Sequence, residues 1–504
     1  MKFLLLSLLA GLISATGFEP LGLWPLTLIA FAWLMWMLQR APSMRSALAR
    51  GWWFGVGNFV LGLNWIATAF TFQSAMPVWL GWIAVVLLSL YLAVYPAMAA
   101  GLAWRYGRKD WLALVFIFAA AWIVTEWLRA TMFTGFAWNP VGVALLPTAA
   151  ARLSTIVGTY GLSGIAMLMA GALLLVFERY RKSGLILLAV VAGASLIKLG
   201  FDGASAGAAG VPISIVQPNI GQSEKWTEGF EERNFARLQG LSAAGRSGPR
   251  LLLWPEAAVT DPLQDERRAL PYRRRAVAVQ QKVAALLGPR DLLLTGGVTF
   301  QSDDGIAVDS ATNSVFAIDA RGRILGRYDK AHLVPYGEYL PARPILSRLG
   351  LSRLAPGSID FDSGPGPRTL ALPGIGKIGF QLCYEIIFSG EVVDRADRPD
   401  LIFNPSNDAW FGRFGPPQHL AQARLRAIEE GLPVLRSTPT GISAVIDADG
   451  QILAQIPWRK AGAINALMPP AKEPTTFARL GNIASFLFAL LLAGIAIAVR
   501  RRAR

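Results

Sequence analysis

The sequence holds a single cysteine, Cys383, and only two histidines, His332 and His419, among its 504 residues. One cysteine excludes an intramolecular disulfide. Zinc sites are built mainly from several cysteines and histidines, so the sequence offers no metal-ligand cluster of that kind. Charged residues are also scarce, at 16% of the chain against 53% hydrophobic residues. That balance is too apolar for an ordinary soluble protein and is typical of a chain with several membrane spans.

Long apolar runs dominate the chain up to about residue 200. A run near twenty residues is long enough to cross the hydrocarbon core of a membrane as a helix. Seven such runs lie in this region and an eighth lies near the C-terminus. The first is short and could equally be a cleavable signal peptide, because Ser14-Ala15-Thr16-Gly17 follows it. The eight runs are 3–15, 21–38, 52–70, 78–102, 111–127, 158–177, 185–199 and 483–499.

Basic residues predict the orientation of these runs, since short cytoplasmic links retain Lys and Arg. The bases fall on every second link, whereas the alternate links are nearly free of positive charge. We therefore predict that both termini are cytoplasmic and that the segment between the seventh and eighth runs lies outside. The fourteen bases are Lys2, Arg40, Arg45, Arg50, Arg105, Arg108, Lys109, Arg179, Arg181, Lys182, Arg500, Arg501, Arg502 and Arg504.

The net charge of +15 comes mostly from these links. Subtracting the neighbouring acids Asp110 and Glu178 from the fourteen bases leaves +12, so the rest of the chain carries about +3. No clustered basic face with interleaved aromatic residues appears in that remainder, which argues against a nucleic-acid partner. Ionisable residues are scarce within the runs, which argues against an ion carrier.

Glu126 is an exception within the apolar runs. It lies in Thr125-Glu-Trp-Leu-Arg129, and the aromatic-rich segment Phe133-Thr-Gly-Phe-Ala-Trp138 follows. Glu126 and Arg129 are three residues apart, so the two side chains could simply pair at the membrane interface. Alternatively, this outer link helps to hold a lipid beside the external domain.

Between about residues 211 and 470, short β-rich runs alternate with helical ones, as in a globular α/β domain large enough for one core. This pattern predicts sheets faced by helices, with polar residues at strand ends forming one site. Expected strands span 212–216, 251–254, 292–300, 314–319, 324–328, 376–381, 401–404, 434–437, 442–447 and 452–456. Expected helices span 228–243, 268–287 and 417–430, and another begins near Ser389.

Glu256, Lys330 and Cys383 each follow one of these strands. Taken singly, a lone cysteine is often only a small core hydrophobe, and Glu and Lys at strand ends are usually solvated. Their chemistry is nevertheless complementary. A thiolate attacks, a carboxylate can take the thiol proton and later activate an incoming nucleophile, and an ammonium lowers the thiol pKa and stabilises oxyanion charge. The three strand ends therefore predict a cysteine nucleophile with a base and a cation.

The segments around these residues resemble the Glu–Lys–Cys triad motifs of the nitrilase superfamily. They are Trp254-Pro-Glu-Ala257, Tyr328-Asp-Lys-Ala-His-Leu-Val-Pro-Tyr-Gly-Glu-Tyr-Leu-Pro341 and Leu382-Cys-Tyr-Glu385. Further segments, together with the apolar runs, look like the apolipoprotein N-acyltransferase family, and this resemblance covers nearly the whole chain. These are Asn404-Pro-Ser-Asn-Asp-Ala-Trp-Phe-Gly412, Gln418-His419 and Arg424-Leu-Arg-Ala427.

The resemblance implies a membrane domain of about eight transmembrane helices plus an external nitrilase-like αββα sandwich. Residues 1–205 would form an N-terminal membrane domain with seven transmembrane helices. Residues 206–470 would form a periplasmic catalytic domain, and 471–504 the last transmembrane helix and a basic cytoplasmic tail. The chain would lie in the bacterial inner membrane as a monomer.

The implied activity is a ping-pong acyl transfer, the final step of bacterial lipoprotein maturation. Cys383 would attack the sn-1 ester of a phospholipid, with phosphatidylethanolamine preferred, to give a thioester. The α-amine of the diacylglyceryl-modified cysteine of an apolipoprotein would then receive the acyl chain. The resemblance implies no metal and no cofactor.

The resemblance also assigns roles to individual residues. Glu256 matches the general base and Lys330 the oxyanion-stabilising lysine. Glu338 matches a further glutamate that positions the lysine or shares the proton work. Tyr384 and Glu385 match the residues that flank the nucleophile. The expected substrate-binding residues are Trp226 on a mobile outer arm, Trp410, Phe411 and His419.

Two other functions fit parts of the pattern. A membrane-tethered amidase or nitrilase would use the same triad with water as the second nucleophile, although such enzymes rarely need eight spans. A transporter or receptor would bind a solute without chemistry, and replacing Cys383 would leave its function unchanged. A free external thiol without a disulfide partner, and spans that bring it to the lipid surface, favour acyl transfer.

Overall fold

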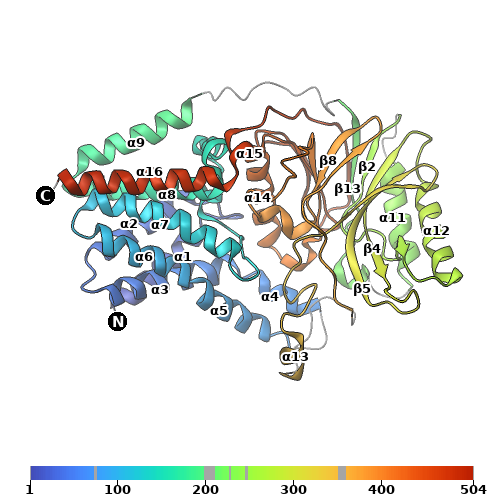
Figure 1. The fold of residues 1–504 in the computed structure, drawn as a ribbon, viewed down its shortest axis with the longest axis horizontal. Helices are drawn as coiled ribbons and strands as arrows, with labels where there is room; N and C mark the ends of the chain where they lie inside the picture. Colours follow the sequence, from blue (N-terminus) through green and yellow to red (C-terminus); the bar gives the residue numbers. More distant parts are fainter. Residues whose placement is uncertain are drawn as a thin grey trace.

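The computed structural model describes residues 2–72, 77–197, 210–225, 229–243, 248–349 and 359–502. Figure 1 shows a bundle of helices at one end of the molecule and a pair of β-sheets with their own helices at the other. The last helix returns to the bundle, so the sheets are formed by a segment inserted between helices of the bundle.

The bundle contains a helix for every apolar run that the sequence predicts to be a span. Its helices are α1 (Lys2–Ala15), α2 (Trp24–Gln39), α3 (Met44–Gly62), α4 (Ile66–Ala69), α5 (Leu80–Leu92), α6 (Val94–Gly107), α7 (Trp111–Thr131), α8 (Ser154–Phe177), α9 (Arg181–Leu196) and α16 (Asn482–Arg502). Short 3-10 turns η1 (Phe70–Phe72), η2 (Val141–Leu145) and η3 (Ala149–Leu153) complete it.

Helix length supports fewer spans than the eight predicted. Among the described residues, four helical stretches are long and apolar enough to cross a membrane, and α3 with the segment after it makes a fifth if this pair, bent by 48°, is one span. Both α1 and α2 are apolar but shorter. The prediction of a multi-span helical region therefore holds at the level of four or five spans.

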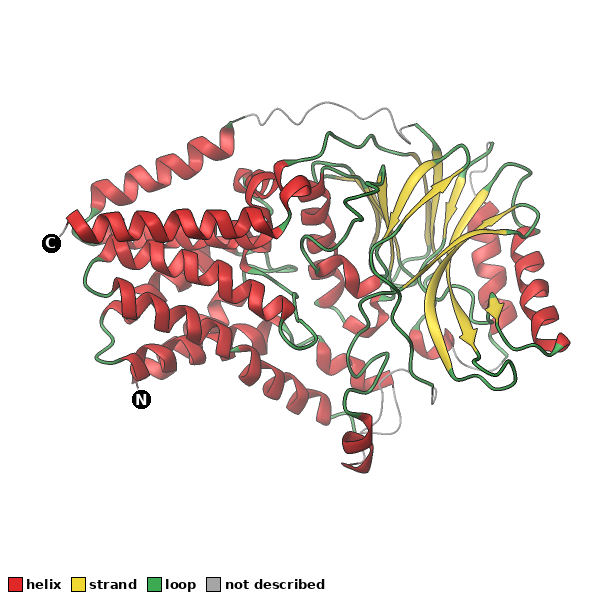
Figure 2. Ribbon diagram, in the orientation of Figure 1, coloured by secondary structure: helices red, strands yellow, loops and turns green. Residues whose placement is uncertain are grey.

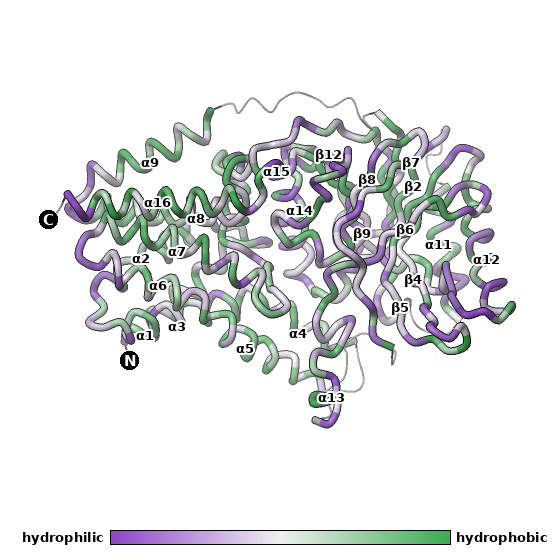
Figure 3. Tube along the Cα trace, viewed as in Figure 1, coloured by the Kyte–Doolittle hydropathy of each residue, from purple (hydrophilic) through white to green (hydrophobic). Residues whose placement is uncertain are grey.

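Small residues allow α7 and α8 to approach closely. A methyl group on Gly164 of α8 would lie 2.5 Å from the Ile123 side chain, and one on Gly171 would lie 2.3 Å from the Val115 side chain. Helices in lipid gain little from the hydrophobic effect and associate through such close packing. Figure 3 shows hydrophobic residues along α8 and α16, with hydrophilic residues at the ends of α9 and α16 farthest from the sheets.

The strands form two sheets, as the alternating pattern predicts. One has the order β13-β1-β2-β4-β5-β6, with β3 beside β4, and the other has the order β12-β11-β10-β9-β8-β7. The first contains β1 (Pro212–Gln217), β2 (Leu251–Leu253), β3 (Gln264–Asp265), β4 (Leu292–Gln301), β5 (Ser310–Asp319), β6 (Ile324–Asp329) and β13 (Gly462–Leu467). The second contains β7 (Thr369–Leu372), β8 (Gly376–Phe380), β9 (Leu401–Pro405), β10 (Val434–Ser437), β11 (Ser443–Ile446) and β12 (Ile452–Ile456).

The two sheets face each other and helices cover their outer faces (Figure 2). The Ser437 hydroxyl on β10 donates to the Val216 carbonyl on β1 at 2.9 Å, which joins the sheets at their centre. Helices α11 (Glu231–Ala243) and α12 (Leu270–Ala284) cover the first sheet, and α14 (Gly415–Glu430) lies between the second sheet and the bundle. The predicted sandwich of two sheets between helices is therefore present.

Other elements are short. They are α10 (Gln222–Lys225), α13 (Arg343–Leu346), η4 (Ser347–Leu349), η5 (Cys383–Ile387), η6 (Asp408–Phe411) and α15 (Thr476–Leu480). The prediction of a helix that begins near Ser389 is wrong. The 3-10 turn η5 occupies the preceding residues, and Gly390 has a φ of 82°, outside the helical range, so the chain continues as turns.

A buried polar seam joins α14 to α8. The Glu429 carboxylate accepts hydrogen bonds from the Thr159 hydroxyl of α8 at 2.5 Å and from the Ser389 hydroxyl at 2.9 Å. Arg426 forms an ion pair with Glu429 at 2.9 Å, and both side chains are buried. This cluster fixes how the sheets sit against the bundle.

Replacing Glu429 with alanine should destabilise the whole chain. The substitution leaves the buried Arg426 guanidinium without its carboxylate, and breaking a buried pair in this way costs about 3–5 kcal/mol. We expect a lower melting temperature in detergent, followed by circular dichroism. Glu231→Ala, at an exposed position of α11, is the control and should change the free energy of unfolding by about 0.5 kcal/mol or less. Equal melting temperatures for the two variants would show that the seam is not stabilising.

Candidate active site

Cys383 lies at the sharp turn that follows β8 and begins η5. Its φ is 53°, in the left-handed region that residues other than glycine rarely adopt. Such a conformation costs about 1–3 kcal/mol and persists only where the surroundings impose it. The residue is 5% exposed. The turn therefore holds one buried sulfur in a fixed direction at the end of a strand.

Glu256 follows β2 of the opposite sheet, after the fully buried Trp254. Gly296 of β4 lies directly behind it, because a methyl group at Gly296 would come within 2.7 Å of the Glu256 Cα. Only glycine fits there. Glu256 is itself buried, and its Oε2 accepts no hydrogen bond from any residue that the structure describes. One carboxylate oxygen is therefore available for a proton.

Lys330 follows β6 and is almost fully buried. Its ammonium lies 2.8 Å from Glu338 Oε2, and its backbone N–H donates to the Asn313 carbonyl at 2.9 Å. Burial acts to lower the pKa of Lys330, but the carboxylates of Glu338 and Glu256 oppose it, and the net pKa is raised. Lys330 is therefore a permanent cation beside the sulfur.

Asn313 of β5 joins the two carboxylates of the site. Its Nδ2 donates to Glu256 Oε1 at 2.8 Å and to Glu338 Oε1 at 2.9 Å. Sequence analysis missed this residue, because an asparagine within a strand between threonine and serine carries no signal of its own. The amide orients both acids without adding charge, so each keeps an oxygen for another partner.

The electrostatic surroundings keep the Cys383 thiol protonated. Burial raises the pKa of Cys383, and Glu256 raises it further, whereas the charge of Lys330 and a hydrogen bond from the Asn407 backbone N–H lower it. The net pKa lies well above the ordinary value. The sulfur therefore becomes a nucleophile only when a base takes its proton. Asp408 also raises the pKa of Cys383, but it is paired with Arg436, whereas Glu256 keeps one oxygen that accepts no hydrogen bond from the described residues.

Lys225 is a second buried cation of the site that sequence analysis missed. Its ammonium donates to the Glu256 carbonyl at 3.0 Å. Burial lowers the pKa of Lys225 to about 8, against the opposing charges of Glu256 and Cys383. The surrounding segment is polar, so nothing in the sequence indicates that this lysine is buried.

Glu385 and Tyr384 support the turn rather than facing solvent. The Glu385 carboxylate accepts hydrogen bonds from the Tyr328 hydroxyl at 2.9 Å and from the Ala331 backbone N–H at 2.7 Å, on either side of Lys330. It thereby ties the Cys383 turn to the Lys330 loop. Tyr384 is buried, and its ring packs against Phe388 with the centroids 5.2 Å apart.

The expected substrate-binding residues lie in different surroundings. Trp226 is outside the described residues. Trp410 is half-buried and its ring lies 5.5 Å from that of Phe72. Phe411 and His419 are buried, so contact with a substrate would require the packing around them to open. A substrate-binding role for Trp410, Phe411 and His419 stays a prediction.

The segment after α7 contacts residues near the site. The His332 ring contacts the Thr134 carbonyl at 3.0 Å, just after α7, and stacks on Phe388 with the centroids 3.8 Å apart. Trp138 donates from its ring N–H to Gln418 of α14 at 2.8 Å. No group of three His, Cys, Asp or Glu residues suited to a metal ion occurs among the described residues. The arrangement is a thiol, a base and a cation beside the ends of apolar helices.

Alkylation of Cys383 by iodoacetamide tests these electrostatics, since no other cysteine can react. Glu256→Gln removes a charge that raises the thiol pKa, so the midpoint of the pH dependence of alkylation should move to lower pH. Lys330→Met removes a charge that lowers the thiol pKa, so this midpoint should move to higher pH. Each unit of pKa changes the thiolate fraction about tenfold.

The control for this experiment is Glu231→Gln on the exposed surface of α11, which should leave the midpoint unchanged. Midpoints that shift in the same direction for Glu256→Gln and Lys330→Met would contradict the assigned charges.

Comparison with known proteins shows the family of this chain. The model of the family described as apolipoprotein N-acyltransferase N-terminal domain matches residues 10–172, and that described as carbon-nitrogen hydrolase matches residues 212–472. Curated proteins named apolipoprotein N-acyltransferase are similar over nearly the whole chain. The protein of Rhodopseudomonas palustris is 34% identical, covering 97% of this chain and 94% of its own. That of Caulobacter vibrioides is 35% identical, covering 97% and 93%. The chain belongs to the apolipoprotein N-acyltransferase family.

Proposed function

We propose that this enzyme transfers a fatty acyl chain from a phospholipid, through a thioester on Cys383, to the α-amine of the diacylglyceryl-modified cysteine of an apolipoprotein. The observation that carries the proposal is the convergence of a buried thiol, a carboxylate with a free oxygen and a buried ammonium beside the end of α7. Membership of the family supports the same activity. The sn-1 ester of phosphatidylethanolamine is the proposed donor.

In the first half of the reaction, Cys383 attacks the ester carbonyl while Glu256 takes the thiol proton. Lys330 would stabilise the negative charge that develops on the former carbonyl oxygen, and the Asn407 N–H would stabilise the attacking thiolate. One such donor contributes about 3–4 kcal/mol to transition-state stabilisation. Collapse of the tetrahedral intermediate breaks the ester bond, and Glu256 returns the proton to the departing alkoxide. A lysophospholipid leaves and an acyl thioester remains.

In the second half, the neutral α-amine of the apolipoprotein attacks the thioester. Glu256 takes a proton from the attacking nitrogen, and collapse breaks the carbon–sulfur bond. The proton then returns to the sulfur, which restores the resting thiol. Glu338 holds Lys330 throughout by its ion pair, and Tyr384 and Glu385 hold the turn. A buried site limits water, which would otherwise hydrolyse the waiting thioester.

The proposed topology places residues 1–205 in the bacterial inner membrane with seven spans, 206–470 in the periplasm and 471–504 as the eighth span and cytoplasmic tail. Contacts between the basic links support it. Arg40 lies 3.6 Å from Glu178, and the Gln39 amide donates to the Arg108 carbonyl at 3.2 Å. Both termini lie at that end of the bundle, away from the sheets (Figure 1).

Exposure of the purified protein to labelled phosphatidylethanolamine should add one acyl mass to the Cys383 peptide, measured by mass spectrometry. Addition of a diacylglyceryl peptide should then discharge the adduct. Cys383→Ala should abolish the adduct, and Glu256→Ala or Lys330→Ala should slow its formation by at least about 10²-fold.

Normal adduct formation in Glu256→Ala or Lys330→Ala would remove that residue from the mechanism. Turnover of a small amide without any phospholipid adduct would favour an amidase. Unchanged function in Cys383→Ala would favour a transporter or receptor.

Cysteine labelling tests the topology, because Cys383→Ala provides a background without cysteine. In that background, Asp303→Cys in the sheet region should react with an impermeant maleimide added to intact spheroplasts. Ser43→Cys, at the start of α3, should react only after the membrane is opened. Both positions are exposed, so the membrane alone should decide which one reacts. Labelling of Ser43→Cys in intact spheroplasts would contradict the proposed orientation.

A further inference from the structure

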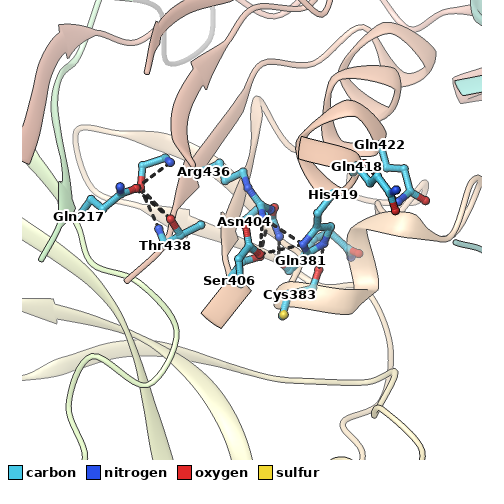
Figure 4. A network of polar contacts seen from close by, with 12 residues as sticks. Gln217, Gln381, Cys383, Asn404, Ser406, Gln418, His419, Gln422, Arg436 and Thr438 are labelled. Carbon is cyan, nitrogen blue, oxygen red and sulfur yellow. Dashed lines mark hydrogen bonds and ion pairs between the residues drawn. The ribbon is translucent and has the colours of Figure 1, made fainter. Parts of the chain in front are cut away.

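A buried polar network lies directly behind the Cys383 turn (Figure 4). His419 of α14 has no exposed surface, and its Nε2 lies 3.0 Å from the backbone carbonyl oxygen of Cys383. A carbonyl only accepts hydrogen bonds, so Nε2 must carry a proton and donate it. His419 thus holds the backbone of Cys383, the residue in a left-handed conformation, by a hydrogen bond to its carbonyl oxygen.

The other side of the ring decides the charge of His419. Its Nδ1 lies 3.0 Å from Asp408 Oδ1 and 3.0 Å from Arg436 Nη2. Arg436 Nη2 is also 2.7 Å from both Asp408 oxygens, so the arginine already satisfies the carboxylate. Asp408 Oδ1 would accept from a protonated Nδ1, which would make the ring an imidazolium, whereas Arg436 Nη2 only donates and needs an unprotonated Nδ1. A neutral ring corresponds to the second arrangement, in which one Nη2 proton is shared by the Asp408 oxygens, the other is donated to Nδ1, and the single imidazole proton is on Nε2.

The charged groups around His419 agree with a neutral ring. Burial lowers its pKa first, and the Arg436 charge lowers it further, whereas Asp408 and the Cys383 carbonyl oppose this change. The net pKa is lowered. Arg436 is also fixed by Asn404 and, at 3.0 Å, by the Ser406 hydroxyl, so it cannot move away to accommodate an imidazolium.

We propose that Asp408, Arg436 and His419 form a positioning relay that holds the Cys383 peptide unit in its left-handed conformation, with His419 neutral and protonated on Nε2. This inference rests on the proposed role of Cys383 as the nucleophile. Fixing the Cys383 carbonyl fixes the direction of the sulfur toward Glu256 and Lys330. A neutral donor does so without adding a third cation to the site.

The bundle takes part in this relay. The Trp138 ring, from the segment after α7, lies 5.2 Å from the His419 ring, and the Phe411 ring lies 5.5 Å from it. Trp138 also donates to Gln418, the neighbour of His419 on α14. These two rings cover the imidazole and keep water from competing for its hydrogen bonds. A segment of the helical region thus helps to orient the nucleophile.

Substitution of His419 tests the relay through the rate of acyl-adduct formation. His419→Leu removes the donor and should slow acylation by about 10²-fold with an unchanged KM for phospholipid, as expected for a misplaced nucleophile. His419→Gln keeps an N–H and should retain a rate within about tenfold of the original. Gln422→Leu is the matched control, because it removes a buried amide of the same helix that does not contact Cys383. The relay is wrong if His419→Leu acylates as fast as Gln422→Leu, or if the entire loss lies in KM.

A second measurement uses the unaltered protein, so it stands even if His419→Leu fails to fold. With ¹⁵N-labelled histidine, the chain gives signals from only two rings, and His332→Asn assigns them. Solid-state NMR of the full chain in lipid should find His419 neutral with its proton on Nε2 between about pH 5 and 8, where histidine ordinarily titrates. A proton on Nδ1, or an imidazolium within that range, would overturn the relay. This readout needs no substrate, so the absence of any acyl adduct would count against the proposed function alone.

Discussion

Burial of several charges beside one sulfur is the constraint on which the site depends. Two carboxylates, Glu256 and Glu338, and two ammonium groups, Lys225 and Lys330, are all buried near Cys383. An isolated buried charge is costly, and removing one partner of a buried pair costs about 3–5 kcal/mol. The groups therefore stabilise one another only in the folded arrangement. The same balance leaves the thiol protonated at rest, so its reactivity depends on the neighbouring carboxylate.

The architecture brings these groups together because strand ends from both sheets meet at one place. Glu256 and Lys330 follow strands of the first sheet, whereas Cys383 follows a strand of the second. A sandwich of two sheets can hold such residues on rigid elements, and Asn313 and Glu385 then link them by hydrogen bonds. The turn at Cys383 stays in an unfavourable conformation because these contacts together stabilise it by more than the conformation costs.

The sequence predicted the elements whose signal is local. Strands such as β9 and β10 begin with short apolar runs, and their bounds agree with the prediction to within one residue. The motifs also identified the strand-end residues that the structure brings together around Cys383. Lys225 and Asn313 could not be predicted from the sequence, because their burial depends on segments far away in the chain. The pairing of Asp408 with Arg436 likewise joins two elements that no local pattern connects.

Polar contacts, rather than apolar ones, set the orientation of the sheets against the bundle. Apolar packing is only weakly directional, and helices in lipid gain little from burying more apolar surface. Hydrogen bonds from Thr159 to Glu429 and from Trp138 to Gln418 have defined geometry and are buried. Since Gln418 and Glu429 lie on α14, which also carries His419, the same helix meets the bundle and supports the Cys383 turn. The position of the sulfur relative to the ends of the apolar helices is therefore fixed through α14.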